Sequence, residues 1–190
     1  MNDAVRVDAV PVSTAPETRA RLLALHTALP DPNQRRMLQI WLDHWWAEVV
    51  YDIDTVCATL SEDVAYRSYG AVTFGGDIRI DGIDAAAAMY RALFARGLMP
   101  GGPFDQERIS FGDWGLHMDA VFTSVFPGDM LPGLALRPDP DALYLIRWHM
   151  AVAHPMDLRR SVMRAEIMYP GAPFLVEPAG RDTIEHLLGR

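Results

Sequence analysis

The sequence predicts an α+β fold in which a curved mixed sheet wraps around helices and forms a conical pocket. Two observations predict this fold. Apolar residues recur at three- and four-residue spacing in the first half of the chain, and they alternate with polar residues in long segments after residue 100. Because the chain has 190 residues, it is about one domain long and can bury a single core.

Helices are predicted over residues 17–29, 34–50, 83–96 and a short segment that Asp52 or Asp54 caps. The helix over 34–50 carries Trp41 and Trp45 on a broad apolar stripe. The helix over 83–96 is rich in alanine and ends at Gly97, a residue type that favours helix ends.

Strands are predicted over residues 64–69, 72–80, 104–111, 116–126, 143–152 and 160–169. The loop over 127–140 is long and could cover an opening of the pocket. A helical turn is expected over 183–188. The chain therefore divides into an N-terminal arm with a short helix (1–32), an α+β domain (33–175) and a C-terminal tail (176–190).

The composition excludes several classes of protein. Acidic residues outnumber basic ones by 25 to 17 and are spread along the chain, which argues against nucleic-acid binding. No apolar run is long enough for a membrane helix, and the single cysteine, Cys57, cannot form an internal disulfide. We expect a cytoplasmic protein without a membrane anchor.

No motif for a metal or a nucleotide cofactor is present in the sequence, so we expect neither. The histidines considered as ligands fall in different predicted elements and lack the pairing that zinc sites show: His44, His117, His149, His154 and His186. The glycine pairs at 75–76 and 101–102 lack the rest of a phosphate-binding signature.

Two stretches carry a family resemblance: YDIDTVCATLSEDVAY over residues 51–66, and DGIDA over 81–85 at the start of the alanine-rich helix. With the four-strand region that follows, they resemble the SnoaL-like branch of the nuclear-transport-factor-2-like superfamily. This branch includes polyketide cyclases, scytalone dehydratase, steroid isomerases and a cofactorless diarylpropane lyase. The resemblance covers about residues 33–169 and implies the conical pocket, whereas fold alone does not fix the reaction.

The candidate catalytic residues are Glu48, Tyr66, Arg147 and His149. Glu48 follows the two tryptophans along one helical edge, where burial would raise a carboxyl pKa toward the range useful for proton transfer. The alternative is a solvated glutamate at a helix end. The segment beginning at Tyr66 resembles a scytalone dehydratase strand that places a tyrosine hydroxyl in the pocket.

Arg147 and His149 share one face of the strand over 143–152, and Arg164 and Glu166 share one face of the next strand. If these polar faces line the cone, Arg147 and His149 would bind or protonate an oxyanion. If they face outward, an apolar and aromatic face lines it instead. The substrate-binding candidates for that second case are Trp41, Trp45, Met89, Tyr144, Trp148 and Tyr169.

The sequence favours a cofactor-independent lyase or isomerase. It would act by acid/base catalysis on a small hydrophobic or aromatic ring substrate, in a dehydration, a cyclisation or a retro-aldol-like cleavage. The alternative is a non-catalytic protein that binds a hydrophobic ligand, or a structural subunit of an oxygenase-type complex. In either case we expect a homo-oligomer, a dimer or a higher assembly.

Overall fold

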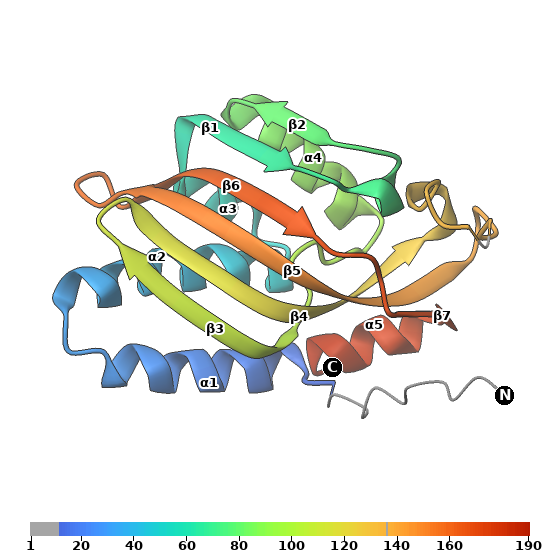
Figure 1. The fold of residues 1–190 in the computed structure, drawn as a ribbon, viewed down its shortest axis with the longest axis horizontal. Helices are drawn as coiled ribbons and strands as arrows, with labels where there is room; N and C mark the ends of the chain where they lie inside the picture. Colours follow the sequence, from blue (N-terminus) through green and yellow to red (C-terminus); the bar gives the residue numbers. More distant parts are fainter. Residues whose placement is uncertain (1–11, 136) are drawn as a thin grey trace, which may run out of the picture.

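The computed structural model describes residues 12–135 and 137–190 (Figure 1). Its helices are α1 (Ala15–Ala28), α2 (Pro32–Val50), α3 (Ile53–Ala58), α4 (Ile83–Ala95) and α5 (Arg181–Leu188), with short 3-10 turns η1 (Val72–Phe74) and η2 (Gly128–Met130). Its strands are β1 (Leu60–Ser68), β2 (Ile78–Asp81), β3 (Phe104–Gly112), β4 (Gly115–Pro127), β5 (Leu143–Asp157), β6 (Val162–Pro170) and β7 (Leu175–Ala179).

Within the described residues, the strands form one curved sheet in the order β2-β1-β6-β5-β4-β3, and β7 pairs with β5. β1 runs parallel to β6, and the other pairs are antiparallel. The predicted mixed sheet of an α+β fold is therefore confirmed. Figure 1 shows α2 behind the sheet and α4 beside β1 and β2.

Helix α2 begins and ends where local chemistry requires it. The Asp31 side chain accepts hydrogen bonds from the first free backbone N–H groups, and Pro32 occupies the first turn, where its missing N–H costs nothing. Tyr51 ends the helix in the left-handed region with φ 61°, and Asp52 then caps α3. The buried stripe of α2 packs against the inner face of the sheet.

Several elements differ from the predictions. Of the strand predicted over 72–80, residues 72–74 form the 3-10 turn η1, and the strand is β2 over Ile78–Asp81. Residues 60–63 begin strand β1 instead of continuing the short helix, since Leu60 pairs with Met163 of β6. The chain also contains a strand that was not predicted, β7, which carries Pro178 and pairs with the first part of β5. A proline is tolerated at a sheet edge and hides the strand pattern in the sequence.

The segments predicted as an arm and a tail both contribute side chains to the core. In α1, Ala15 and Leu22 are buried, and in α5 Ile184, Leu187 and Leu188 are buried. Figure 1 shows α1 and α5 at the same edge of the molecule, where they contact each other. Both terminal helices thus pack on the α+β domain; the part of the arm over 1–11 lies outside the described residues.

Across the described residues, none of the helices is both long enough and apolar enough to cross a membrane.

We predict that Leu187→Ala lowers the free energy of unfolding by about 2–4 kcal/mol, because it opens a cavity in a packed core. The matched control is Glu185→Ala on the exposed side of α5, which should cost less than about 0.5 kcal/mol. Urea denaturation followed by circular dichroism measures both. Equal, small costs for the two variants would show that α5 is not part of the cooperative core.

Candidate active site

A cavity of about 340 Å³ lies between α2, α4 and the concave face of the sheet. Its walls come from β1, β4, β5 and β6, and Met130 of the loop after β4 contributes to them together with Phe74 of η1. The lining is almost entirely apolar and aromatic. The ionisable side chains on it are His44, Glu48, Tyr66, Tyr90, His154 and Glu166.

One face of α2 supplies four of the lining side chains: Trp41, His44, Trp45 and Glu48. They are three, four and seven residues apart, which is the spacing of a single helical face. The rings of Trp41 and Trp45 are stacked, with centroids 6.0 Å apart. These large rings exclude water from the wall that carries His44 and Glu48.

A chain of hydrogen bonds connects the polar side chains of this wall. The Tyr90 hydroxyl donates to Glu48 Oε1 at 2.6 Å, and the hydroxyls of Tyr66 and Tyr90 lie 3.0 Å apart. His44 Nε2 lies 3.2 Å from Glu48 Oε1, and His44 Nδ1 lies 2.8 Å from Thr59 Oγ1. Because several partners hold it, the Glu48 carboxylate is fixed in one orientation at the cavity wall.

The two tyrosines act as donors and not as bases. Burial raises the pKa of Tyr66 and the pKa of Tyr90 well above the ordinary value for a phenol. After burial, the second-largest cause of the raised pKa is the charge of Glu166 for Tyr66 and the charge of Glu48 for Tyr90. Both hydroxyls therefore keep their protons near neutral pH.

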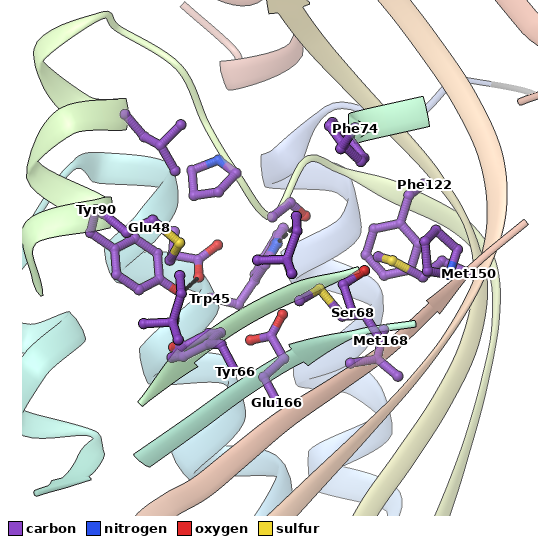
Figure 2. Close-up of a pocket in the computed structure, with 18 of the residues that line it drawn as sticks. Trp45, Glu48, Tyr66, Ser68, Phe74, Tyr90, Phe122, Met150, Glu166 and Met168 are labelled. Atoms are coloured by element: carbon purple, nitrogen blue, oxygen red, sulfur yellow. Dashed lines mark hydrogen bonds between the residues drawn. The ribbon is translucent and has the colours of Figure 1, made fainter. Parts of the chain in front are cut away.

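Glu166 projects into the cavity from β6, and Figure 2 shows its carboxyl group on the same side as Glu48, Tyr66 and Tyr90. Burial raises its pKa to about 8, and the charge of Glu48 adds to this effect. Near neutral pH, Glu166 is therefore mostly a neutral carboxylic acid. In the described part of the chain its carboxyl group forms no hydrogen bond, which leaves its proton available to a ligand.

Gly101 permits the close approach of a loop to this site. A side chain at position 101 would collide with Glu48 Oε2 and press on the Trp45 ring. The backbone carbonyls of Gly101 and Gly102 each accept from Trp45 Nε1 at 3.2 Å. The loop between α4 and β3 thus packs directly over the Glu48 carboxylate.

Six of the predicted site residues lie on the cavity wall. They are Trp41, Trp45, Glu48, Tyr66, Met89 and Trp148. The structure brings Glu48 and Tyr66 together through Tyr90, and it places Trp148 beside Phe126 and Phe74.

The prediction that Arg147 and His149 line the pocket is wrong. The side chains of β5 that line the cavity include Trp148, Met150 and Val152, which are all even-numbered. The odd-numbered side chains therefore point to the convex face. There Arg147 donates to Thr123 Oγ1 at 3.1 Å and pairs with Asp105 at 3.5 Å.

His149 is exposed and lies against Phe174, with ring centroids 5.5 Å apart. The alternation along a strand gives two faces but does not say which one points inward. The apolar face of β5 lines the cavity, whereas on β6 the face that carries Glu166 lines it.

Two of the predicted binding residues also lie outside the cavity. The Tyr144 hydroxyl accepts a hydrogen bond from the backbone of Asp139 at 2.9 Å, outside the set of lining side chains. Tyr169 is 53% exposed and stacks on Tyr69. Tyr169 belongs to the odd-numbered face of β6, opposite Glu166, so its ring cannot reach the cavity.

Sequence reasoning missed His44, Tyr90 and His154 as site residues. His44 and Glu48 are four residues apart on the tryptophan stripe, so this pair had a readable signal. Tyr90 sits in an alanine-rich helix whose orientation the sequence does not give. The strand predicted over 143–152 stops short of His154, whereas β5 continues to Asp157 and carries His154 on the inner face.

Among the described residues, His44, Glu48 and Glu166 form a group that could hold a divalent metal ion. Their candidate ligand atoms all lie within 4.8 Å of one another. Imidazole and carboxylate ligands suit several first-row metals. However, His44 Nε2 and Glu48 Oε1 already contact each other and the Tyr90 hydroxyl, so a metal would have to displace these contacts.

We predict that Glu166→Gln changes how stability depends on pH. With a folded-state pKa near 8 and an ordinary value of 4.5, Glu166 holds a proton in the folded protein that the unfolded chain releases. Its contribution to the free energy of unfolding is therefore full below about pH 4.5 and declines as the pH rises to about 8. The stability of Glu166→Gln relative to wild type should rise steadily over that range.

Urea denaturation at pH 5, 6, 7 and 8 measures this difference. Glu62→Gln, an exposed carboxyl on β1, serves as the control and should run parallel to wild type. A Glu166→Gln curve that also runs parallel would contradict the raised pKa.

Solved structures of known proteins show the same fold at low sequence identity. A candidate SnoaL-like polyketide cyclase from Shewanella putrefaciens CN-32 matches with a TM-score of 0.55 and 10% identity over 70% of this chain and 88% of that chain. A candidate SnoaL-like polyketide cyclase from Shewanella denitrificans OS-217 matches with a TM-score of 0.53 and 14% identity over 71% of this chain and 90% of that chain. A candidate polyketide cyclase from Xanthomonas campestris pv. campestris matches with a TM-score of 0.51 and 15% identity over 82% of this chain and 98% of that chain.

No protein-family model and no curated protein matches the sequence. The structural matches span most of each partner chain. At these identities the matches establish the fold and leave the activity open. This chain therefore has the fold of the SnoaL-like polyketide cyclase structures that it matches.

Proposed function

We propose that this protein is a cofactor-independent lyase or isomerase that moves protons on a small hydrophobic or aromatic substrate. The observation that carries the proposal is the pairing of Glu48 with Glu166 in one apolar cavity. Glu48 accepts a hydrogen bond from the Tyr90 hydroxyl, and Glu166 holds its proton near neutral pH. A carboxyl group that keeps its proton, placed beside one that a donor orients, is suited to act as the acid to the other's base.

The proton transfer can be written for a substrate with a carbonyl group. Glu48 takes a proton from the carbon beside the carbonyl, and the electron pair of that C–H bond forms the carbon–carbon double bond of an enol. The carbonyl oxygen accepts the proton of Glu166. When the substrate also carries a β,γ carbon–carbon double bond, this enol is a dienol. Return of the proton from Glu48 to its γ carbon, which moves the double bond into conjugation with the carbonyl, and return of the enol proton to Glu166 complete an isomerisation and restore both groups.

The same groups serve an elimination. Glu166 would protonate a leaving hydroxyl group, which departs as water, while Glu48 removes a proton from the neighbouring carbon. Tyr66 and Tyr90 keep their protons: the Tyr90 hydroxyl donates to Glu48, and the Tyr66 hydroxyl contacts that of Tyr90. The cavity supports these steps because its stacked tryptophans keep water from the two carboxyl groups.

The proposed roles are tested by proton exchange on 1-tetralone, a neutral bicyclic ketone, in deuterated buffer. We expect wild type to accelerate loss of the NMR signal of the hydrogens beside the carbonyl. Glu48→Gln and Glu166→Gln should each lower the protein-catalysed rate by at least ~100-fold, as removal of a positioned base or acid does. Tyr66→Phe should lower it by about tenfold, the effect of one hydrogen bond.

Asp43→Asn on the exposed side of α2 is the control and should match wild type. The wild-type rate should fall above about pH 8, where Glu166 loses its proton, and this decline should be absent in Glu166→Gln. If wild type accelerates no exchange while it binds the ketone, the non-catalytic alternative of a hydrophobic-ligand-binding protein replaces the proposal.

Chelation separates this proposal from metal-dependent catalysis. Incubation with EDTA should leave the exchange rate unchanged, because the proposed steps use side-chain groups alone. Metal analysis of the purified protein by mass spectrometry accompanies the assay. A rate that is lost on chelation and restored by Zn²⁺ or Mn²⁺ would assign the group of His44, Glu48 and Glu166 to a metal and contradict the proposal.

A further inference from the structure

His154 is a buried imidazole on the cavity wall that the proposed proton transfers do not use. It is 2% exposed, and neither ring nitrogen has a hydrogen-bond partner among the described residues. It lines the cavity together with Trp148, Met150 and Val152 on the same face of β5. A buried polar group without a partner costs folding free energy, so its presence here calls for a ligand.

His154 lies apart from Glu48 along α2, whereas Glu166 is its neighbour on the adjacent strand, because Ala153 of β5 pairs with Ile167 of β6. Its ring lies 5.9 Å from the ring of Trp41, between centroids. Trp41 and Glu48 are seven residues apart on α2, which places them about two turns or ~10 Å apart along the helix axis. His154 therefore marks one end of the cavity, and Glu48 marks a point farther along the same helix.

The His154 end is the closed end. The side chains around it are nearly inaccessible, with Met118 at 1%, Val152 at 2% and Trp41 at 3% exposure. In contrast, Phe74 and Met130 at the other end of the cavity are only partly buried. A ligand that enters past Phe74 and Met130 would bring its leading end to His154.

The cavity selects against anionic ligands. Among the described residues that line it, none is a lysine or an arginine, whereas two are glutamates, Glu48 and Glu166. Burial also lowers the pKa of His154 to about 3, with the nearby His44 and His117 adding to the effect. A neutral imidazole can both donate and accept a hydrogen bond, which suits a hydroxyl or carbonyl group.

We infer that His154 is a specificity-determining residue that binds an uncharged oxygen, a hydroxyl or a carbonyl, at the inner end of an elongated aromatic substrate. The β5 side chains from 148 to 154 that line the cavity extend over roughly 20 Å of strand, which gives room for such a molecule. The reacting carbon would then lie beside Glu48 and Glu166. The inference rests on the proposed function in taking this cavity as the substrate site.

The test compares two probes of nearly equal shape, naphthalene and 2-naphthol, by equilibrium dialysis. We expect wild type to bind 2-naphthol at least about fivefold more tightly, the effect of a hydrogen bond made in a site that excludes water. His154→Leu should abolish or reverse this preference while its affinity for naphthalene is kept or improved. His154→Gln, whose amide can also donate and accept, should retain part of the preference.

His149→Leu is the matched control, because it makes the same change on the opposite face of β5 and should leave the preference unchanged. His154→Leu should also unfold at the same or a higher temperature than wild type, since it removes an unpartnered polar group from the core. A clear loss of thermal stability would instead indicate a structural role and overturn the inference.

Two further outcomes would overturn the inference. One is the absence of a hydroxyl preference in wild type. The other is a preference that survives His154→Leu and disappears in Glu48→Gln, which would place the bound oxygen at the carboxyl groups. Dialysis measures binding without turnover, so a wild type that exchanges no protons but prefers 2-naphthol through His154 would refute the proposed function alone.

Discussion

The burial of two carboxyl groups in one apolar cavity is the constraint on which the rest of the site depends. Both groups cannot carry a charge there without a large cost, so one of them keeps its proton. Tyr90 donates its hydrogen bond to Glu48, and His44 Nε2 lies 3.2 Å from the same carboxyl group, whereas Glu166 keeps its proton. The position of the Tyr90 donor beside Glu48 therefore decides which carboxyl group acts as the base and which as the acid.

The alternation of β5 makes this apolar cavity possible. Its even-numbered side chains from Trp148 to His154 line the cone, and its odd-numbered side chains lie on the convex face, where Arg147 pairs with Asp105. A cation on the inner face would stabilise both carboxyl groups as anions and remove the raised pKa of Glu166. The exclusion of Arg147 from the cavity is therefore part of the chemistry that Glu166 can perform.

His154 shows the conflict between stability and function in the same strand. Leucine or phenylalanine at this position would satisfy the core, as Leu116 does across the β4–β5 ladder. An imidazole without hydrogen-bond partners instead lowers the free energy of unfolding and offers a ligand a hydrogen-bonding group. Glu48 lies about two helical turns from Trp41, the ring that His154 contacts, so the base and this contact could change independently.

The sequence by itself determined the helices, most of the strands and the tryptophan stripe with Glu48, because these depend on local spacing and capping. The pairing of His44 with Glu48 could also be predicted, since four residues separate them on one helix. Only the tertiary structure decided which faces of β5 and β6 line the cone. Alternation gives two faces per strand but not their direction, which the packing of the sheet against α2 and α4 sets. For the same reason the meeting of Glu166 with Glu48, and the isolation of His154, arise from contacts between residues far apart in the chain.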